Sequence, residues 1–246
     1  MKPKRLARVV WIAGLLSVPG AVWVQSATTG AIAGPSTTHQ VPSADMLPPT
    51  IPIFPLPDVV LFPNVSQPLH IFEPRYRAMV ADALQGDRII GMVLLQPGYE
   101  ANYEGRPPVY PIGCAGVITN VERLPDGRFN IVLRGLVKFR VTGEDRSRPY
   151  RLAHVDAIPE LPDDEEKVAL SKQRQRLEAV VTAFLEGSGS EPRFPPEIPD
   201  GDLVNALAQY LELDPIERQV LLERRGVLSR SRALIDLLEM KVMTRR

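Results

Sequence analysis

Cysteine and histidine are scarce in this sequence, and their scarcity excludes several kinds of site. Cys114 is the single cysteine among 246 residues, so the chain can form no internal disulfide and no zinc site built from several thiolates. The three histidines, His39, His70 and His154, lie far apart and show no metal-ligand spacing. We therefore predict neither a metal nor a cofactor, and we interpret His70 and His154 as structural residues of strands.

Motifs for nucleotide and serine chemistry are absent as well. The sequence has no Gly-Lys pair and hence no phosphate-cradling P-loop, and it has no G-x-S-x-G nucleophile elbow. Cys114 follows a Pro-Ile-Gly turn at the start of an apolar strand, where a small buried thiol is favoured over a nucleophile. We predict a protein that is not an enzyme. An unrecognised hydrolase acting through His70, His154 or Cys114 is the alternative that these residues leave open.

Charge is balanced, with 29 basic and 29 acidic residues. This balance argues against a nucleic-acid-binding surface over the whole molecule, since such binding depends on clustered Lys and Arg, and it leaves a local basic patch open. Four consecutive acids at residues 163–166 are interpreted as the first turn of a helix, where they complement the helix dipole, and not as a cation site. Arg75 and Arg77 flank Tyr76 at another helix start. They offer an anion site, but pairing of one of them with Glu73 or a nearby carboxylate is favoured.

The N-terminus has the layout of an export signal. A basic start is followed by an uncharged apolar run at residues 9–24 and an A-x-A pattern at residues 31–33, as in secretory signal peptides. We predict a signal peptide or uncleaved anchor at residues 1–26 and a flexible linker at residues 27–48. This favours the periplasm or envelope, with membrane contact only through an uncleaved N-terminal segment. If translation starts at Met46, we expect a cytoplasmic protein.

Short apolar strands and one helix are predicted for the first half of the remaining chain. Residues 51–53 and 59–62 are strand-like but broken by prolines, which predicts edge or interrupted strands able to accept an added strand. A helix is expected from Pro74, with Tyr76, Met79 and Val80 on its buried face. Further strands are predicted at residues 89–95 and 151–158. Residues 115–121 and 129–141 are predicted to form a hairpin, with the apolar residues of 129–141 on one face and a bend or bulge at Gly135.

The second half reads as helical. A long periodic segment predicts a helix over residues 163–186. Two short helices are predicted over residues 202–213 and 215–225, and a final helix is predicted with Ser229 as its cap. A loop rich in Gly, Pro and Tyr is expected at residues 96–111, and its Tyr99, Tyr103 and Tyr110 are candidates for recognition because tyrosine offers large contact area at low entropic cost. Core-anchoring tyrosines are the equally favoured alternative.

A family resemblance rests on several segments taken together. The sequence resembles the LON substrate-binding domain, the N-terminal domain of ATP-dependent Lon proteases, over about residues 50–240. The segments that carry it are Ile51-Pro-Ile-Phe-Pro-Leu56, Val59-Val-Leu-Phe-Pro63, Pro68-Leu-His-Ile-Phe-Glu-Pro-Arg-Tyr76, residues 89–95, Gly113-Cys-Ala-Gly-Val-Ile118 and Leu133-Arg-Gly135.

The resemblance implies an α+β fold and a binding function. It implies a PUA-like β pseudo-barrel with one packed helix at residues 49–160, followed by a C-terminal α-helical bundle at residues 161–246. It also implies recognition of unfolded polypeptide or a partner protein, linked to protein quality control. The 246 residues contain neither the P-loop nor the Ser-Lys protease motif of Lon, so we expect a stand-alone, non-catalytic protein and carry over no catalytic residue. The predicted polypeptide contacts are Phe54, Phe62, Tyr99, Tyr103 and Tyr110.

Nucleic-acid binding is the remaining alternative function. PUA-like barrels include RNA-binding modules, but the zero net charge and the lack of a strand with interleaved basic and aromatic residues weigh against it here.

Overall fold

The computed structural model describes residues 47–103, 105–186 and 192–245. The predicted signal peptide or anchor at residues 1–26 and most of the predicted linker lie outside this range, and so does the basis for the expected cellular location. None of the helices within the described residues combines the length and the apolar character that crossing a membrane requires.

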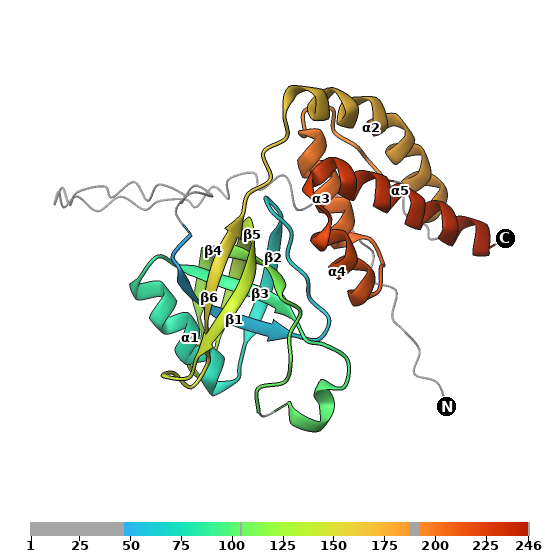
Figure 1. The fold of residues 1–246 in the computed structure, drawn as a ribbon. Coiled ribbons are helices and arrows are strands. Elements are labelled where there is room, and N and C mark those ends of the chain that lie inside the picture. The colour runs from blue at the N-terminus through green and yellow to red at the C-terminus, as the bar shows by residue number, and fades with distance from the viewer. Residues whose placement is uncertain (1–46, 104, 187–191, 246) are drawn as a thin grey trace, which may run out of the picture.

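The strands come first together with helix α1, and the remaining helices follow (Figure 1). The strands are β1 (Thr50–Leu56), β2 (Ser66–Ile71), β3 (Ile89–Leu94), β4 (Ile112–Arg123), β5 (Phe129–Asp145) and β6 (Arg151–Ile158). Helix α1 (Pro74–Gln85) follows β2, and a short 3₁₀ turn, η2 (Tyr99–Asn102), follows β3. The remaining helices are α2 (Asp164–Leu185), α3 (Asp200–Tyr210), α4 (Pro215–Glu223) and α5 (Gly226–Arg245).

Strands β5, β4, β3, β1 and β6 close into a ring, and β2 pairs with β5 outside this ring. We call the six strands together the barrel. The order is β2-β5-β4-β3-β1-β6, and β6 pairs again with β5. Strand β5 makes this closure because its first half pairs with β2 and its second half with β6, while β4 covers the other edge. An apolar cluster with members from all five ring strands, including Ile53, Val93 and Phe139, fills the interior.

A bulge at Leu136 divides β5 between two cores. Ala115 pairs with Val137 while the next residue, Gly116, pairs with Gly135, which leaves Leu136 as the extra residue of the bulge. The bend predicted at Gly135 is thus confirmed, but the single apolar face predicted for residues 129–141 is wrong. Ile131 and Leu133 belong to a second apolar cluster, which lies outside the barrel interior and includes residues of α1 and of the C-terminal helices. Val137 and Phe139 belong to the interior of the barrel.

Strand β1 lies inside the sheet and not at its edge, which corrects the prediction drawn from its prolines. Its residues 50–53 pair with β6 and its residues 53–56 pair with β3. Val155 N–H donates to the Pro49 carbonyl, and the alternation of antiparallel pairs then places Pro52 at a position whose nitrogen points away from β6. Each half of β1 pairs with a neighbouring strand along one side only. The strand therefore tolerates prolines, which have no N–H to donate.

Residues 60–62 are buried and Val59 is partly buried, but this segment forms no strand, which corrects the strand predicted at residues 59–62. Helix α3 supplies their hydrogen bonds instead. The Phe62 N–H donates to Gln209 Oε1 at 3.0 Å, and Asn205 Nδ2 donates to the Pro63 carbonyl at 3.1 Å. The expected free edge for an added strand is therefore covered by the helical part, by which we mean α2–α5.

Several helix boundaries follow the local chemistry that predicts them. Pro74 opens α1, Asp163 accepts a hydrogen bond from the Glu166 N–H at 2.8 Å to cap α2, and Asp214 forms a capping box with Glu217 at α4. The start of the last helix is the exception, because α5 begins at Gly226 and Ser229 lies within it. The acids at residues 163–166 are thus part of a helix start, as interpreted.

Candidate functional site

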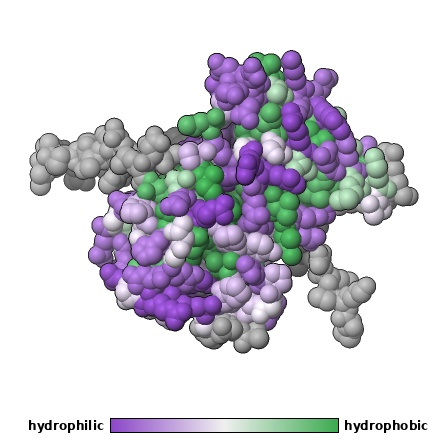
Figure 2. Space-filling model, viewed as in Figure 1, coloured by the Kyte–Doolittle hydropathy of each residue, from purple (hydrophilic) through white to green (hydrophobic). Residues whose placement is uncertain are grey.

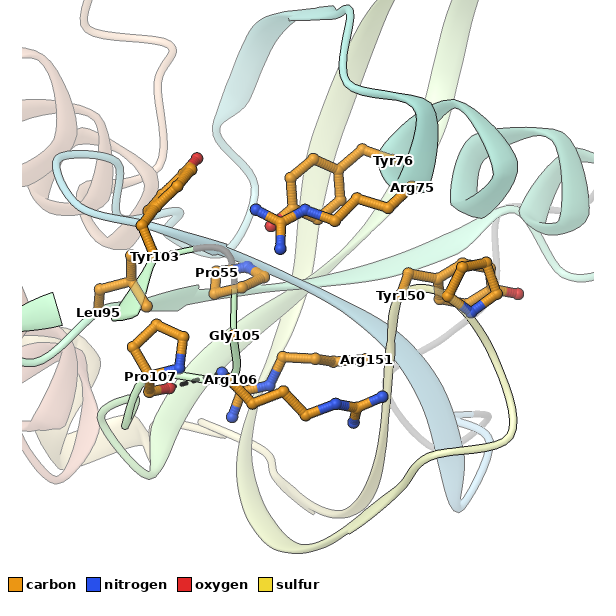
Figure 3. A pocket seen from close by; sticks show the side chains of 11 residues that line it. Pro55, Arg75, Tyr76, Leu95, Tyr103, Gly105, Arg106, Pro107, Tyr150 and Arg151 are labelled. Atoms are coloured by element: carbon orange, nitrogen blue, oxygen red, sulfur yellow. Dashed lines mark hydrogen bonds between the residues drawn. The ribbon is translucent and has the colours of Figure 1, made fainter. Parts of the chain in front are cut away.

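Three of the hollows in the described residues are large enough to hold part of a ligand, and one of them, of about 340 Å³ beside α1 and the β4–β5 turn, is wide open to solvent. Of the other two, the first, of about 290 Å³, lies between the start of α1, the loop after β3 and the start of β6 (Figure 3). The second, of about 410 Å³, lies where the barrel meets the helical part. Figure 2 shows hydrophobic residues gathered near this junction and a mainly hydrophilic surface on the lower barrel.

Arginine and tyrosine dominate the first hollow, which we call the Arg–Tyr pocket. Prolines complete its walls. Its charged and aromatic lining residues are Arg75, Tyr76, Tyr103, Arg106, Tyr150 and Arg151, and Pro55, Pro107 and Pro149 also line it.

The upper wall is built on the first turn of α1. Pro74 fixes the helix start, and Tyr76 on the buried face packs on Phe54 with ring centroids 4.3 Å apart. The Arg75 guanidinium lies 4.7 Å from the centroid of the Tyr76 ring and 5.3 Å from that of Tyr103, within the range of cation–π attraction. This wall therefore presents a guanidinium held between two aromatic rings.

Glu73 ties the loop after β3 to this helix. It accepts a hydrogen bond from Arg75 Nε and another from the Tyr103 hydroxyl, each at 3.0 Å. The predicted pairing of an arginine of this helix with Glu73 is thus confirmed for Arg75. The consequence for the pocket is that Tyr103, a loop residue, is held at a fixed place in the wall.

The opposite wall is an arginine pair joined by Glu144. Arg151 is 8% exposed and donates to the Pro107 carbonyl at 2.7 Å and, from Nε, to Glu144 at 3.2 Å. Arg106 lies with Nη1 3.7 Å from Glu144 and donates from it to the Asp145 carbonyl at 3.2 Å. In Figure 3 the side chains of Arg106 and Arg151 lie across the pocket from Arg75.

The phenols of the pocket are uncharged donors at neutral pH. Burial raises the pKa of Tyr76 to about 12, and burial together with a 2.6 Å hydrogen bond to Asp82 raises the pKa of Tyr150 to about 12. Burial and the Glu73 hydrogen bond also raise the pKa of Tyr103. Among the described residues, the charge of the site is therefore set by three guanidinium groups and the carboxylates of Glu73 and Glu144, with the Asp82–Arg148 ion pair beside Tyr150.

The five predicted contact residues are not brought together. Tyr103 lines the pocket. The Tyr99 ring packs edge-on against the Tyr103 ring, with ring centroids 6.2 Å apart. Tyr110 is partly buried against the core, and its N–H donates to the Leu94 carbonyl at 2.9 Å. Phe54 and Phe62 are 5% and 0% exposed, which leaves their side chains little surface for a partner.

Sequence reasoning missed Arg106, Tyr150 and Arg151. They come from separate segments that meet because β6 closes the barrel against β5 and β1. No spacing signal joins positions 106 and 151. A charged residue at the first position of a predicted strand, as Arg151 is, was the nearest available hint.

The residues considered for hydrolysis lie apart from this pocket. Cys114 is fully buried, and burial raises the pKa of its thiol. His70 is exposed and contacts Asn130 Oδ1 at 2.7 Å, whereas His154 contacts the Thr50 hydroxyl at 2.9 Å. In the described part of the chain no three His, Cys, Asp or Glu side chains are grouped to hold a metal ion.

The junction crevice, as we call the second hollow, has polar walls that are already engaged. Lys138 donates to the carbonyls of Leu222 and Arg224 at 3.1 and 2.7 Å and pairs with Glu160 at 2.8 Å. These three partners use all the N–H donors of an ammonium group. The Arg–Tyr pocket is thus the better candidate for a site with polar recognition.

Comparison with known proteins gives consistent matches. The chain is 26% identical to Lon protease 2 of Myxococcus xanthus over 200 residues, and 29% identical to the Lon protease of Trichlorobacter lovleyi over 198 residues. These alignments cover 79% and 78% of this chain but 24% of each relative, so the chain spans about a quarter of the length of the relatives it matches.

A solved structure supports the same fold. The N-terminal domain of the Mycobacterium avium complex Lon protease aligns with a TM-score of 0.55 and 21% identity, covering 77% of this chain and 98% of that one. The family model of the ATP-dependent protease La (LON) substrate-binding domain matches residues 50–240, which include every strand and most of the helical part. The chain belongs to the LON substrate-binding domain family.

Proposed function

We propose that this protein binds polypeptides without transforming them, in protein quality control. The observation that carries the proposal is the match of a substrate-binding domain model to residues 50–240. The closed ring of strands followed by helices supports the PUA-like barrel and helical arrangement that the resemblance implies. The buried, protonated Cys114 supports a role that needs no nucleophile.

The Arg–Tyr pocket is the proposed place of contact. Its tyrosines and prolines offer rigid apolar area, and its arginines offer hydrogen-bond donors. Its volume of about 290 Å³ is at the lower end for ligand sites, which suits one or two side chains of an extended segment.

A binding measurement with one polypeptide in two states tests this function. The full-length chain is titrated against a dye-labelled disulfide-bonded protein, once native and once reduced and blocked with a neutral alkylating reagent. We expect saturable binding of the unfolded form, weaker binding of the native form, and recovery of the polypeptide at unchanged mass. Absence of binding to the unfolded form would reject the proposal, and fragments in the mass spectrum would reject its non-catalytic part.

A further inference from the structure

Among the described residues, positive charge exceeds negative charge in the Arg–Tyr pocket by one unit, since Asp82, which accepts from Tyr150, is itself paired with Arg148. Arg75, Arg106 and Arg151 face two carboxylates, Glu73 and Glu144, that contact them. Each carboxylate also has a second partner, since Glu73 accepts a hydrogen bond from Tyr103 and Glu144 contacts both Arg106 and Arg151. The internal ion pairs therefore do not neutralise the pocket.

Arg106 keeps hydrogen-bond donors available. Only its Nη1 has partners among the described residues, the Asp145 carbonyl at 3.2 Å and Glu144 at 3.7 Å. Its Nε and Nη2 donors have none in that part of the chain, and its side chain is 26% exposed. Arg75 uses its Nε and Nη2 for Glu73, which leaves Nη1 without a carboxylate or carbonyl partner among the described residues.

A carboxylate is the group that complements these donors. A guanidinium presents N–H donors in a planar fork that matches a carboxylate and binds it through charge-assisted hydrogen bonds. The surrounding tyrosines and prolines suit the neighbouring backbone and side chains of a peptide. One unit of excess charge in a small hollow is far from the basic surface that a nucleic-acid backbone requires.

We propose that the Arg–Tyr pocket recognises a carboxylate of an extended polypeptide, an inference that rests on the proposed polypeptide-binding function. Arg106 contacts the carboxylate directly, with Arg75 on the other wall. Arg151 is a positioning residue, because it is buried and holds Glu144 beside Arg106. The carboxylate comes either from an Asp or Glu side chain or from the C-terminus of the bound chain.

Four synthetic peptides distinguish these sources. Each is an extended sequence of Gly, Ser, Pro and one Tyr with a neutral dye at its N-terminus. The four combine a central Glu or Gln with a free or amidated C-terminus. Affinity for the full-length chain is measured by fluorescence anisotropy. We expect at least one peptide with a carboxylate to bind about tenfold more tightly than the Gln, amidated peptide, as for one charge-assisted hydrogen bond.

Variants at Arg106 connect this preference to the pocket. Arg106→Gln is expected to remove the preference of about tenfold for the carboxylate, and Arg106→Lys to restore part of it, since lysine keeps the charge without the fork. Arg176→Gln is the matched control, because Arg176 is 62% exposed and pairs with Glu239 in the helical part. It should leave the preference unchanged. Circular dichroism checks that all variants fold.

The outcomes separate this inference from the proposed function. Equal binding of all four peptides, or an unchanged preference in Arg106→Gln, would overturn the inference. Binding of the unfolded protein without binding of any peptide would also overturn the inference. In each of these cases the proposed polypeptide-binding function would be retained. If neither the peptides nor the unfolded protein bind, both proposals fail.

Discussion

Glu160→Gln is expected to lower the free energy of unfolding by about 3–5 kcal/mol, the cost of removing one partner from a buried ion pair. Glu160 accepts from Arg230 Nη2 at 2.7 and 2.9 Å and pairs with Lys138 at 2.8 Å. Arg230 is 0% and Lys138 2% exposed. The amide would leave two buried cations without a counterion.

This network joins the barrel to the helical part. Lys138 lies in β5, Glu160 in the connection between β6 and α2, and Arg230 in α5. Arg230 also donates to Asn205 in α3 at 2.6 Å and to the Leu221 carbonyl in α4 at 3.0 Å. Loss of the carboxylate therefore weakens the contacts of α3, α4 and α5 with the barrel together.

Urea unfolding followed by circular dichroism measures the effect. Glu239→Gln is the control, since it removes the partner of the exposed Arg176, and exposed ion pairs contribute about 0–1 kcal/mol. A similar small loss for both variants would contradict the assigned role of the network.

Gly135→Ala is expected to destabilise the protein by about 3 kcal/mol or more, at the upper end of overpacking costs. A Cβ at this position would lie 2.0 Å from the Phe62 carbonyl oxygen. The segment cannot easily move away, because Gly135 N–H donates to the Val65 carbonyl and Asn64 N–H donates to the Gly135 carbonyl. The bulge at Leu136 holds the other side.

The control for this substitution is Gly201→Ala in the first turn of α3. A Cβ there would meet Val227 at 3.5 Å, an ordinary contact, and alanine favours the helix by up to about 1 kcal/mol. We expect Gly201→Ala to leave the urea midpoint unchanged or raised while Gly135→Ala lowers it. Equal midpoints would show that the close approach at Phe62 relaxes without cost.

Local chemistry made much of this fold predictable. Pro74 begins α1, and the acids at residues 163–166 lie at the start of α2, as predicted, because such signals act over a few residues. The strand predicted at residues 89–95 is present as β3, and all of its residues are buried.

Predictions failed where a distant segment decides the structure. The prolines of β1 suggested an edge, but pairing with β6 and β3 on different halves of the strand accommodates them. The apolar run at residues 59–62 suggested a strand, but Gln209 and Asn205 from α3 take over its hydrogen bonds. Nothing near these segments in the sequence indicates such partners.

The candidate site was predictable only where a residue belongs to a local sequence feature. Tyr103 and Arg75 stood out because each belongs to a recognisable local feature, a Tyr-rich loop and a helix start. Arg106 and Arg151 form one wall of the site because Glu144 lies between them and contacts both side chains. Closure of the barrel brings this constellation together, and one sequence without spacing signals does not reveal it.

Photocrosslinking from within the Arg–Tyr pocket tests the central claim most directly. One full-length chain carries a photoreactive phenylalanine analogue at position 103, and a matched chain carries it at position 161, where Leu161 is 83% exposed at the junction crevice. Both are irradiated with the same unfolded polypeptide. If the pocket is the place of contact, the polypeptide crosslinks at position 103 and much less at position 161. Crosslinks at position 161 with none at position 103 would contradict it.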